Sequence, residues 1–178
     1  MPTTATRITL DEYMNTSYSP DLEFVDGELR ERNIGQNEHA RMQALLSAWF
    51  VQHEEEWHVT GFSGIRTQVF PTAVLLPDLI LTRDVPQPRV ITAPPVLCVE
   101  ILSPEDTLAE TQRKCQHYFE MGVTACWIID PERRRGYWSV GAEDENGIWR
   151  KSLHLEVPGT GIFADLEPFF EKIARSRA

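Results

Sequence analysis

The sequence has no long hydrophobic run, and none approaches the roughly 18 apolar residues that a membrane-spanning helix needs. Its first residues also lack the apolar segment of a secretory signal. Cysteine is scarce: Cys98, Cys115 and Cys126 are an odd number of thiols in apolar or helical patterns, which is typical of buried free thiols in a reducing compartment. A metal site built from Cys115 and His117 is disfavoured, because it would lack the paired ligand spacing of zinc sites. We therefore expect a soluble, cytoplasmic protein with no membrane partner.

Positive charge is also scarce. The chain has 17 Lys and Arg residues against 27 Asp and Glu residues, which gives a formal net charge of −10 at pH 7. This balance argues against a surface coated with phosphate-binding residues, because nonspecific affinity for nucleic acid depends on Lys and Arg. It does not exclude a nuclease, since bound cations offset the charge of an acidic metal site. Local basic clusters remain: residues 133–135, which we interpret as a solvated turn, and the set Arg30, Arg32 and Arg66.

The rest of the composition is that of a globular chain. Its 178 residues are 42% hydrophobic and 25% charged, without a low-complexity tract or an internal repeat. This length fits one domain with a single core over residues 1–178, of which we expect residues 1–7 to be flexible.

Capping and turn signals organise the first part of the chain. Thr9, with Glu12 three residues later, forms a capping box for a short helix, and Asp26-Gly27 between alternating residues is a strong hairpin signal. Asn37 is predicted to cap a long helix whose stripe recurs at three- and four-residue steps. The members of this stripe are His39, Met42, Leu45, Leu46, Trp49, Phe50 and His53. A strand is expected around residues 67–70.

The second part of the chain alternates strands with helices. Thr107 and Glu110 form another capping box, and the helix that begins there connects the strand of Glu100 to the strand of Trp127. Such a connection predicts a parallel pair with a right-handed crossover. The other expected elements are strands over residues 79–81, 96–102, 125–131, 136–140 and 148–155, a loop over 83–95 and a helix over 165–174. The predicted fold class is therefore α/β or α+β, with a mixed central β-sheet flanked by helices and an N-terminal hairpin.

Two carboxylates lie inside apolar, strand-like runs. Asp78 follows Pro77 and opens the run over residues 79–81, and Glu100 lies within residues 96–102. An ionised carboxylate in such a run costs several kcal/mol unless it is paired or binds a metal. If the two strands pair, the carboxylates converge, and hard oxygen ligands of this kind select Mg²⁺ or Mn²⁺. Such an ion lowers the pKa of a bound water and stabilises charge on a phosphate under attack.

A lone lysine follows on the next predicted helix. Lys114 lies at the edge of the apolar stripe, one turn before Tyr118. Its ammonium can reach back over the sheet, where it would orient an attacking water or neutralise developing phosphate charge. The alternative is a lysine that extends from the border of the stripe into solvent. On spacing alone, the second interpretation is preferred.

Several short motifs, taken in order, resemble those of a known family. They are residues 23–28 (EFVDGE), His39, Pro77-Asp78-Leu79, residues 99–104 (VEILSP), Asp106, Lys114, Tyr118, Gly122-Val123 and residues 127–131 (WIIDP). Their order and spacing over roughly residues 10–170 are similar to the Uma2 family, formerly a domain of unknown function, within the PD-(D/E)XK nuclease superfamily. The resemblance implies a restriction-endonuclease-like core. It also implies a Mg²⁺- or Mn²⁺-dependent endonuclease that hydrolyses phosphodiester bonds of DNA with a metal-activated water.

The resemblance also implies roles for individual acids. Asp78 and Glu100 would be metal ligands, with the carbonyl of Ile101 as a third ligand. Glu23, from the first hairpin, would be a further acid that reaches a second metal or a water. Without the resemblance, Glu23 reads as a solvated hairpin residue.

The basic residues of the implied site leave alternatives open. Superfamily members usually place the lysine two residues after the glutamate, where this chain has Leu102. Lys114 matches the lysine of this family's helix and would take that role, although a displaced lysine is also compatible with an inactive site. His39 is either packed at the head of its helix or faces the site near the scissile phosphate. Asp106 is expected to help cap the helix at Thr107 rather than to bind metal.

Two other functions remain as alternatives. A catalytically inactive nuclease fold that binds nucleic acid or protein would suit the negative charge and the displaced lysine. A glycosidase that uses Asp78 and Glu100 as acid and base needs only the correct separation of the carboxylates, and no aromatic sugar platform supports it. Cutting two strands suits twofold symmetry, so a homodimer is a candidate assembly. The apolar residues 162–170 either form its interface or pack on the core of their own chain.

Overall fold

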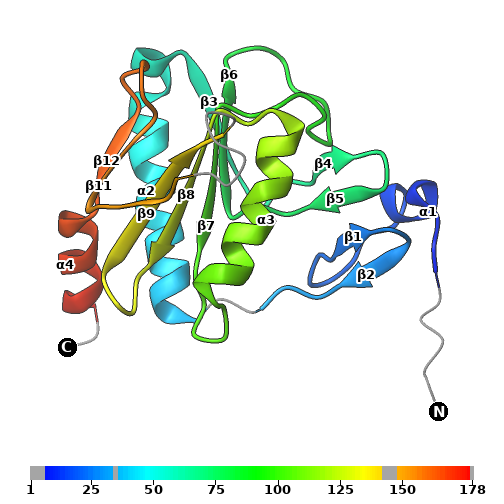
Figure 1. Ribbon diagram of the computed structural model, residues 1–178, viewed down its shortest axis with the longest axis horizontal. Helices are drawn as coiled ribbons and strands as arrows, with labels where there is room; N and C mark the ends of the chain where they lie inside the picture. Colours follow the sequence, from blue (N-terminus) through cyan, green and yellow to red (C-terminus); the bar gives the residue numbers. More distant parts are fainter. Residues whose placement is uncertain (1–6, 34–35, 142–147, 177–178) are drawn as a thin grey trace.

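The computed structural model describes residues 7–33, 36–141 and 148–176. A six-stranded sheet with the order β10-β9-β8-β7-β6-β3 forms its centre (Figure 1). Its strands are β3 (Val59–Ser63), β6 (Leu79–Arg83), β7 (Leu97–Ile101), β8 (Ala125–Asp130), β9 (Arg135–Val140) and β10 (Arg150–Lys151). The β7–β8 pair is parallel and the other described pairs of this sheet are antiparallel. The predicted mixed central sheet is confirmed.

Helices cover both faces of this sheet (Figure 1). α2 (Asn37–Trp57) and α4 (Glu167–Arg175) pack on one face, and α3 (Leu108–Met121) packs on the other. Successive residues of a strand point to opposite faces, so Val99 joins the hydrophobic cluster under α2 and Cys98 joins the one under α3. Because both faces are covered, β7 and β8 are buried along their whole length, which explains their continuous apolar sequences.

A second, four-stranded sheet with the order β2-β1-β5-β4 lies on the α3 side of the molecule. It consists of β1 (Glu23–Val25), β2 (Glu28–Arg30), β4 (Thr67–Phe70) and β5 (Ala73–Leu75), and the short helix α1 (Leu10–Met14) packs beside it. The predicted hairpin is confirmed: Asp26 and Gly27 have φ values of 51° and 87°. Positive φ at both turn residues is what a two-residue hairpin of this twist requires. The hairpin places Glu23 at the edge of the pocket described below.

The predicted helix starts are partly confirmed. Thr9 caps α1 in a full capping box, and Thr107 caps α3 by accepting the N–H of Glu110. The prediction for Asn37 is wrong, because Asn37 is the first residue of α2 and the cap position is Gln36, whose side chain makes no capping hydrogen bond.

The C-terminal part differs most from the prediction. Residues 148–155 do not form one strand: β10 belongs to the central sheet, whereas β11 (His154–Glu156) pairs with β12 (Phe163–Asp165). The final helix therefore begins at Glu167, after β12. The apolar part of residues 162–170 is buried in the core of its own chain: Ile162, Ala164, Leu166, Phe169 and Phe170.

Two further expectations concern the N-terminal residues and a membrane-spanning helix. Of residues 1–7, which were expected to be flexible, residues 1–6 lie outside the described residues. No helix within the described part of the chain is long and apolar enough to cross a membrane.

Candidate functional site

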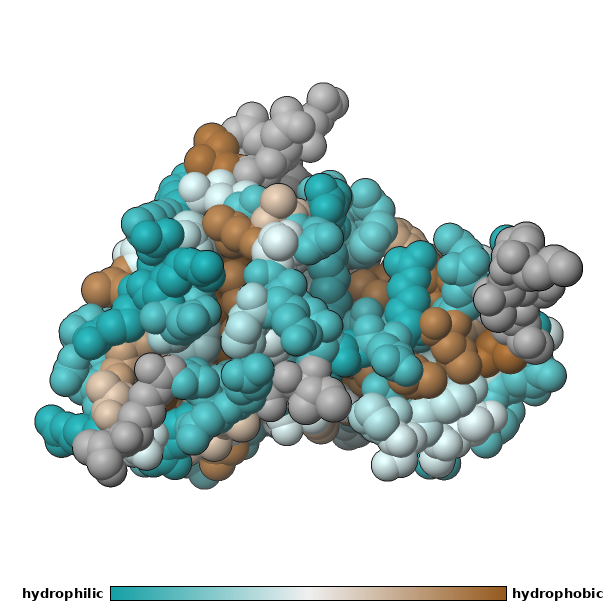
Figure 2. All heavy atoms as spheres, turned by 90° about the horizontal axis from the view of Figure 1, so that it is seen from below, coloured by the Kyte–Doolittle hydropathy of each residue, from teal (hydrophilic) through white to brown (hydrophobic). Residues whose placement is uncertain are grey.

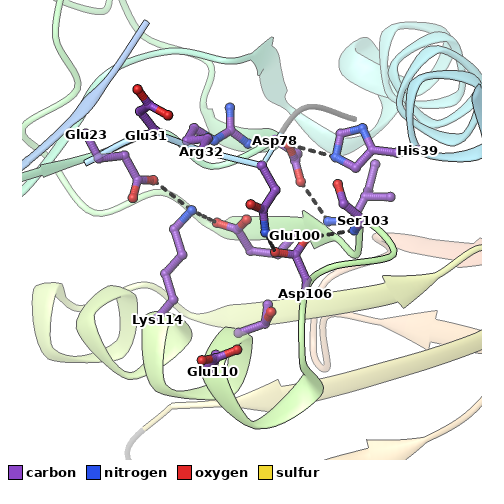
Figure 3. A pocket seen from close by; sticks show the side chains of 13 residues that line it. Glu23, Glu31, Arg32, His39, Asp78, Glu100, Ser103, Asp106, Glu110 and Lys114 are labelled. Atoms are coloured by element: carbon purple, nitrogen blue, oxygen red, sulfur yellow. Dashed lines mark hydrogen bonds and ion pairs between the residues drawn. The ribbon is translucent and has the colours of Figure 1, made fainter. Parts of the chain in front are cut away.

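A polar pocket of about 190 Å³ lies where the hairpin, the start of α2, the residue before β6, the end of β7 and the first turns of α3 meet (Figure 3). All residues that the sequence predicted for the site line this pocket: Glu23, His39, Asp78, Glu100, Ile101 and Lys114. They come from widely separated parts of the chain, so the pocket exists only in the folded protein.

The register of β6 and β7 brings the two buried acids together. Leu79 is opposite Val99 at the end of this antiparallel ladder, and Asp78 and Glu100 are the residues that extend the same register by one step. Directly opposed residues share a face of the sheet. Asp78 is only 2% exposed and Glu100 only 6%, so both carboxylates need partners inside the protein.

Asp78 has partners on both carboxylate oxygens. Arg32 Nη2 donates to Oδ1, and His39 Nε2 lies 3.3 Å from the same oxygen. The backbone N–H of Ile101 donates to Oδ2 over 2.7 Å. Gln43 Nε2 of α2 donates to the Asp78 carbonyl over 3.0 Å, which fixes the backbone against α2. Asp78 is therefore held by contacts from three different segments.

Glu100 belongs to a second set of contacts, which Lys114 connects to the hairpin. The hydroxyl of Tyr118 donates to Glu100 Oε1 over 2.5 Å, and Lys114 Nζ lies 3.0 Å from the same oxygen. Lys114 Nζ also lies 2.8 Å from Glu23 Oε1, which accepts the backbone N–H of Leu76. Lys114 and Tyr118 are four residues apart on α3 and so share the helix face over the sheet. One ammonium thus bridges two acids (Figure 3).

The surroundings shift the two acids in opposite directions. Burial tends to raise the pKa of Asp78, but the hydrogen bond from His39 and the charge of Arg32 outweigh it, so the pKa is lowered. Burial raises the pKa of Glu100 to about 7, although Lys114 pulls it down. Burial acts to lower the pKa of Lys114, but the charges of Glu100 and Glu23 raise it overall. The surroundings therefore favour the charged forms of Asp78 and Lys114 and the protonated form of Glu100.

Asp106 does not play the predicted role. Its carboxylate accepts the N–H of Ser103 over 2.7 Å and a hydrogen bond from Asn33 over 2.6 Å, and Thr107 caps α3 on its own. Asp106 therefore ties the loop after β7 to the segment after β2.

Arg32 and Tyr118, whose side chains contact the carboxylates of Asp78 and Glu100, were not predicted for the site. Arg32 was noted only as part of a basic cluster, and nothing in the sequence connects it to Asp78. Tyr118 was interpreted through the apolar stripe of α3, and it is fully buried there, but its hydroxyl contacts Glu100.

The donor atoms in the pocket fit a hard divalent cation by their chemistry. Mg²⁺ is usually bound through one or two carboxylates, with water and substrate phosphates as its other ligands. Asp78 and Glu100 supply such a pair. Within residues 7–33, 36–141 and 148–176, no group of three or more His, Cys, Asp or Glu side chains is arranged to hold a metal ion.

The chain is similar to a known family and to a solved structure. A family model described as "Putative restriction endonuclease", the Uma2 model, matches residues 10–162. The crystal structure of a "putative nuclease belonging to DUF820" from Anabaena variabilis ATCC 29413 is similar with a TM-score of 0.79 and 18% identity. This similarity covers 93% of this chain and 99% of that one, and at this identity it shows the fold. No curated protein matches the sequence. The match over most of its length shows that the chain belongs to the Uma2 family of restriction-endonuclease-like proteins.

Proposed function

We propose that this protein is a Mg²⁺- or Mn²⁺-dependent endonuclease that hydrolyses phosphodiester bonds of DNA. The observation that carries the proposal is the convergence of two buried carboxylates, Asp78 and Glu100, with the ammonium of Lys114 in one polar pocket. Placing charges in this way costs stability, and such clusters are typical of functional sites. The family match and the shared fold support a nuclease.

In this proposal Asp78 and Glu100 hold the cation, with the carbonyl of Ile101 as a further ligand. The cation supplies a water of lowered pKa and charge stabilisation at the phosphate. The protein's own contribution is orientation: the N–H of Ile101 fixes one oxygen of Asp78, and Tyr118 fixes one oxygen of Glu100. Both acids are thereby held before any ligand arrives, which lowers the cost of organising the site.

The basic residues act on the water and the phosphate. Lys114 is held between Glu23 and Glu100, where its ammonium orients the attacking water or neutralises charge that develops on the phosphate. His39, 11% exposed beside Asp78, lines the pocket. In this proposal it acts near the scissile phosphate. Glu23 positions Lys114 from the hairpin side.

The test combines cleavage with metal binding. Asp78→Asn and Glu100→Gln keep the shape of each side chain, and Glu171→Gln is a matched control on an exposed acid of α4. Plasmid nicking with Mg²⁺ or Mn²⁺ should fall at least about 100-fold in both site variants and stay unchanged in the control. Mn²⁺ binding measured by isothermal titration should weaken in the same two variants. Nicking that persists in both folded site variants would refute the assignment.

A catalytically inactive nuclease fold that binds nucleic acid or protein is the second candidate. It is favoured by the fact that both acids already have a protein cation as partner, Arg32 for Asp78 and Lys114 for Glu100. Wild-type protein that binds neither Mg²⁺ nor Mn²⁺, alone or with DNA present, would decide for this candidate.

The proposal includes the cytoplasm as the compartment and a homodimer as the assembly. Cys98, Cys115 and Cys126 are all buried and free, which suits a reducing compartment. Because the C-terminal apolar residues are buried in their own chain, a dimer would need another surface. The face shown in Figure 2 is mostly hydrophilic with small, separate hydrophobic patches, so it offers no broad apolar interface. Light scattering of the purified protein measures the assembly directly.

A further inference from the structure

Arg32 and Asp78 form a contact that the proposed chemistry does not use. Arg32 follows β2 in a segment outside the regular elements, and its guanidinium reaches Asp78 Oδ1 across 46 residues of sequence. The side chain of Arg32 is 28% exposed, whereas that of Asp78 is 3% exposed. The arginine therefore enters the pocket from its solvent side.

The acceptor capacity of Asp78 is nearly filled. A carboxylate oxygen offers about two lone-pair positions. Oδ1 faces both Arg32 and His39, and Oδ2 accepts the N–H of Ile101. A divalent cation that binds Oδ1 must therefore replace one of these partners.

Arg32 is the partner that can leave most readily. The Ile101 N–H belongs to the backbone of a buried strand, and His39 is 11% exposed on the first turn of α2. Of these three partners of the Asp78 carboxylate, Arg32 is the most exposed, and its side chain is long and flexible. On leaving, the guanidinium regains the water that burial removes from it, and the incoming cation replaces its attraction to Asp78.

We propose that Arg32 is the exchangeable counter-cation of Asp78, so that a divalent cation binds by displacing its guanidinium. This proposal rests on the proposed function. Without the cation, Arg32 offsets the charge of a buried carboxylate that would otherwise destabilise the fold. With the cation bound, that need disappears, and Arg32 stays at the pocket with its donors free. The exchange weakens the metal affinity of the wild type relative to a protein without Arg32.

The first experiment is titration of Mn²⁺ into wild type, Arg32→Gln, Arg32→Lys and the control Arg134→Gln. Arg134 also pairs with carboxylates, Glu167 and Glu171, and its loss changes the net charge equally away from the pocket. We expect the Kd for Mn²⁺ to fall about tenfold in Arg32→Gln, the size of effect that a lost competing ion pair produces. Arg32→Lys should lie between wild type and Arg32→Gln, because a lysine keeps the charge but not the geometry of the guanidinium. The control should equal wild type.

The second experiment observes the exchange in the wild type and does not depend on the folding of a variant. In ¹H–¹⁵N spectra of the arginine Nε groups, the signal that is absent from Arg32→Gln should move during a Mg²⁺ titration. If Arg32→Gln does not fold, Arg32→Lys identifies the signal. A signal that stays unchanged while Mg²⁺ saturates the protein would overturn the proposal.

The outcomes separate this inference from the proposed function. Mn²⁺ binding that is lost in Asp78→Asn but equal in wild type and Arg32→Gln overturns the role of Arg32 alone. An Arg32→Lys protein with the wild-type Kd, beside a tighter Arg32→Gln, would mean that charge alone matters and would also overturn it. A wild type that binds neither ion overturns both proposals.

Discussion

Replacement of Lys114 by methionine is the most informative single change, because one ammonium neutralises two buried acids. Lys114 Nζ lies 2.8 Å from Glu23 and 3.0 Å from Glu100, and the three side chains are 22%, 12% and 7% exposed. Methionine keeps much of the stem's apolar packing and removes only the charge. Both acids would then lose their common cation while they remain inside the protein.

The size of the effect follows from this geometry. Removing one partner of a buried ion pair costs about 3–5 kcal/mol, and because Lys114 keeps some contact with solvent we expect about 3 kcal/mol. For a chain of this length that corresponds to a fall in Tm of about 6–12 °C.

The variant should lose additional stability as the pH rises. Burial raises the pKa of Glu100 to about 7, above its ordinary value of 4.5, so the folded state binds the proton more tightly than the unfolded state. The wild type already loses stability to the ionisation of Glu100 as the pH rises through 7, but in the wild type the charge of Lys114 lowers the pKa of Glu100. Removing Lys114 raises that pKa further, so the variant should lose more stability than the wild type between pH 5 and pH 8.

Urea unfolding followed by circular dichroism measures the change in free energy, with Lys172→Met as the control for an exposed lysine of α4. The double variant Lys114→Met/Glu23→Gln should regain about 1–2 kcal/mol, because one of the two stranded acids is then neutral. A Lys114→Met protein within about 0.5 kcal/mol of wild type, like the control, would refute the reasoning. It would mean that water or another cation already compensates the two acids.

Three further outcomes are expected. Tyr118→Phe removes the hydroxyl that donates to Glu100 and should cost about 1.5–3 kcal/mol in urea unfolding, with no change in secondary structure. Gly136→Ala should destabilise by about 1–3 kcal/mol, because the added Cβ would lie 2.6 Å from the Ser152 carbonyl, whereas Gly161→Ala, which meets nothing closer than 3.9 Å, should be neutral. The three buried thiols should resist a thiol reagent at pH 8 in the native protein and react together on unfolding. Burial raises the pKa of Cys98 and Cys126 well above the ordinary value of a thiol, which disfavours the reactive thiolate. Fast reaction in the native state would contradict this expectation.

Local signals predicted the elements that depend on a few neighbouring residues. The turn at Asp26-Gly27 and the caps at Thr9 and Thr107 are set within four residues of sequence, and the structure has all of them. β5, with three residues, was not predicted, because it exists through pairing with β1 and β4. No periodicity can be read from so short a segment.

The division of residues 148–155 shows the same limit. The sequence reads as one extended run, but Arg150–Lys151 pairs with β9 and His154–Glu156 pairs with β12. Which partner a short strand takes depends on the rest of the fold, and the hydrophobic pattern of the run does not contain that choice.

The acids of the site were predictable for a reason that Arg32 does not share. A carboxylate in an apolar strand violates the usual pattern, so the sequence alone marks Asp78 and Glu100 as candidates. Arg32 lies in a polar segment where an arginine is ordinary. Only the folded chain shows that its guanidinium reaches Asp78. A residue that violates its local pattern can be found from the sequence. A residue distant in sequence that forms an ion pair with it cannot.

The position of the lysine extends this reasoning. The sequence has Leu102 where the related superfamily motif has its lysine, and Leu102 is buried in the cluster under α3. A lysine at 102 would therefore need to leave that cluster. Lys114 instead delivers its ammonium to within 3.0 Å of Glu100 from the helix that covers the same strand. The proposed chemistry uses a positive charge at this carboxylate and sets no condition on which element supplies it. We infer that this chain keeps the lysine of the motif but supplies it from α3, through Lys114, and not from position 102.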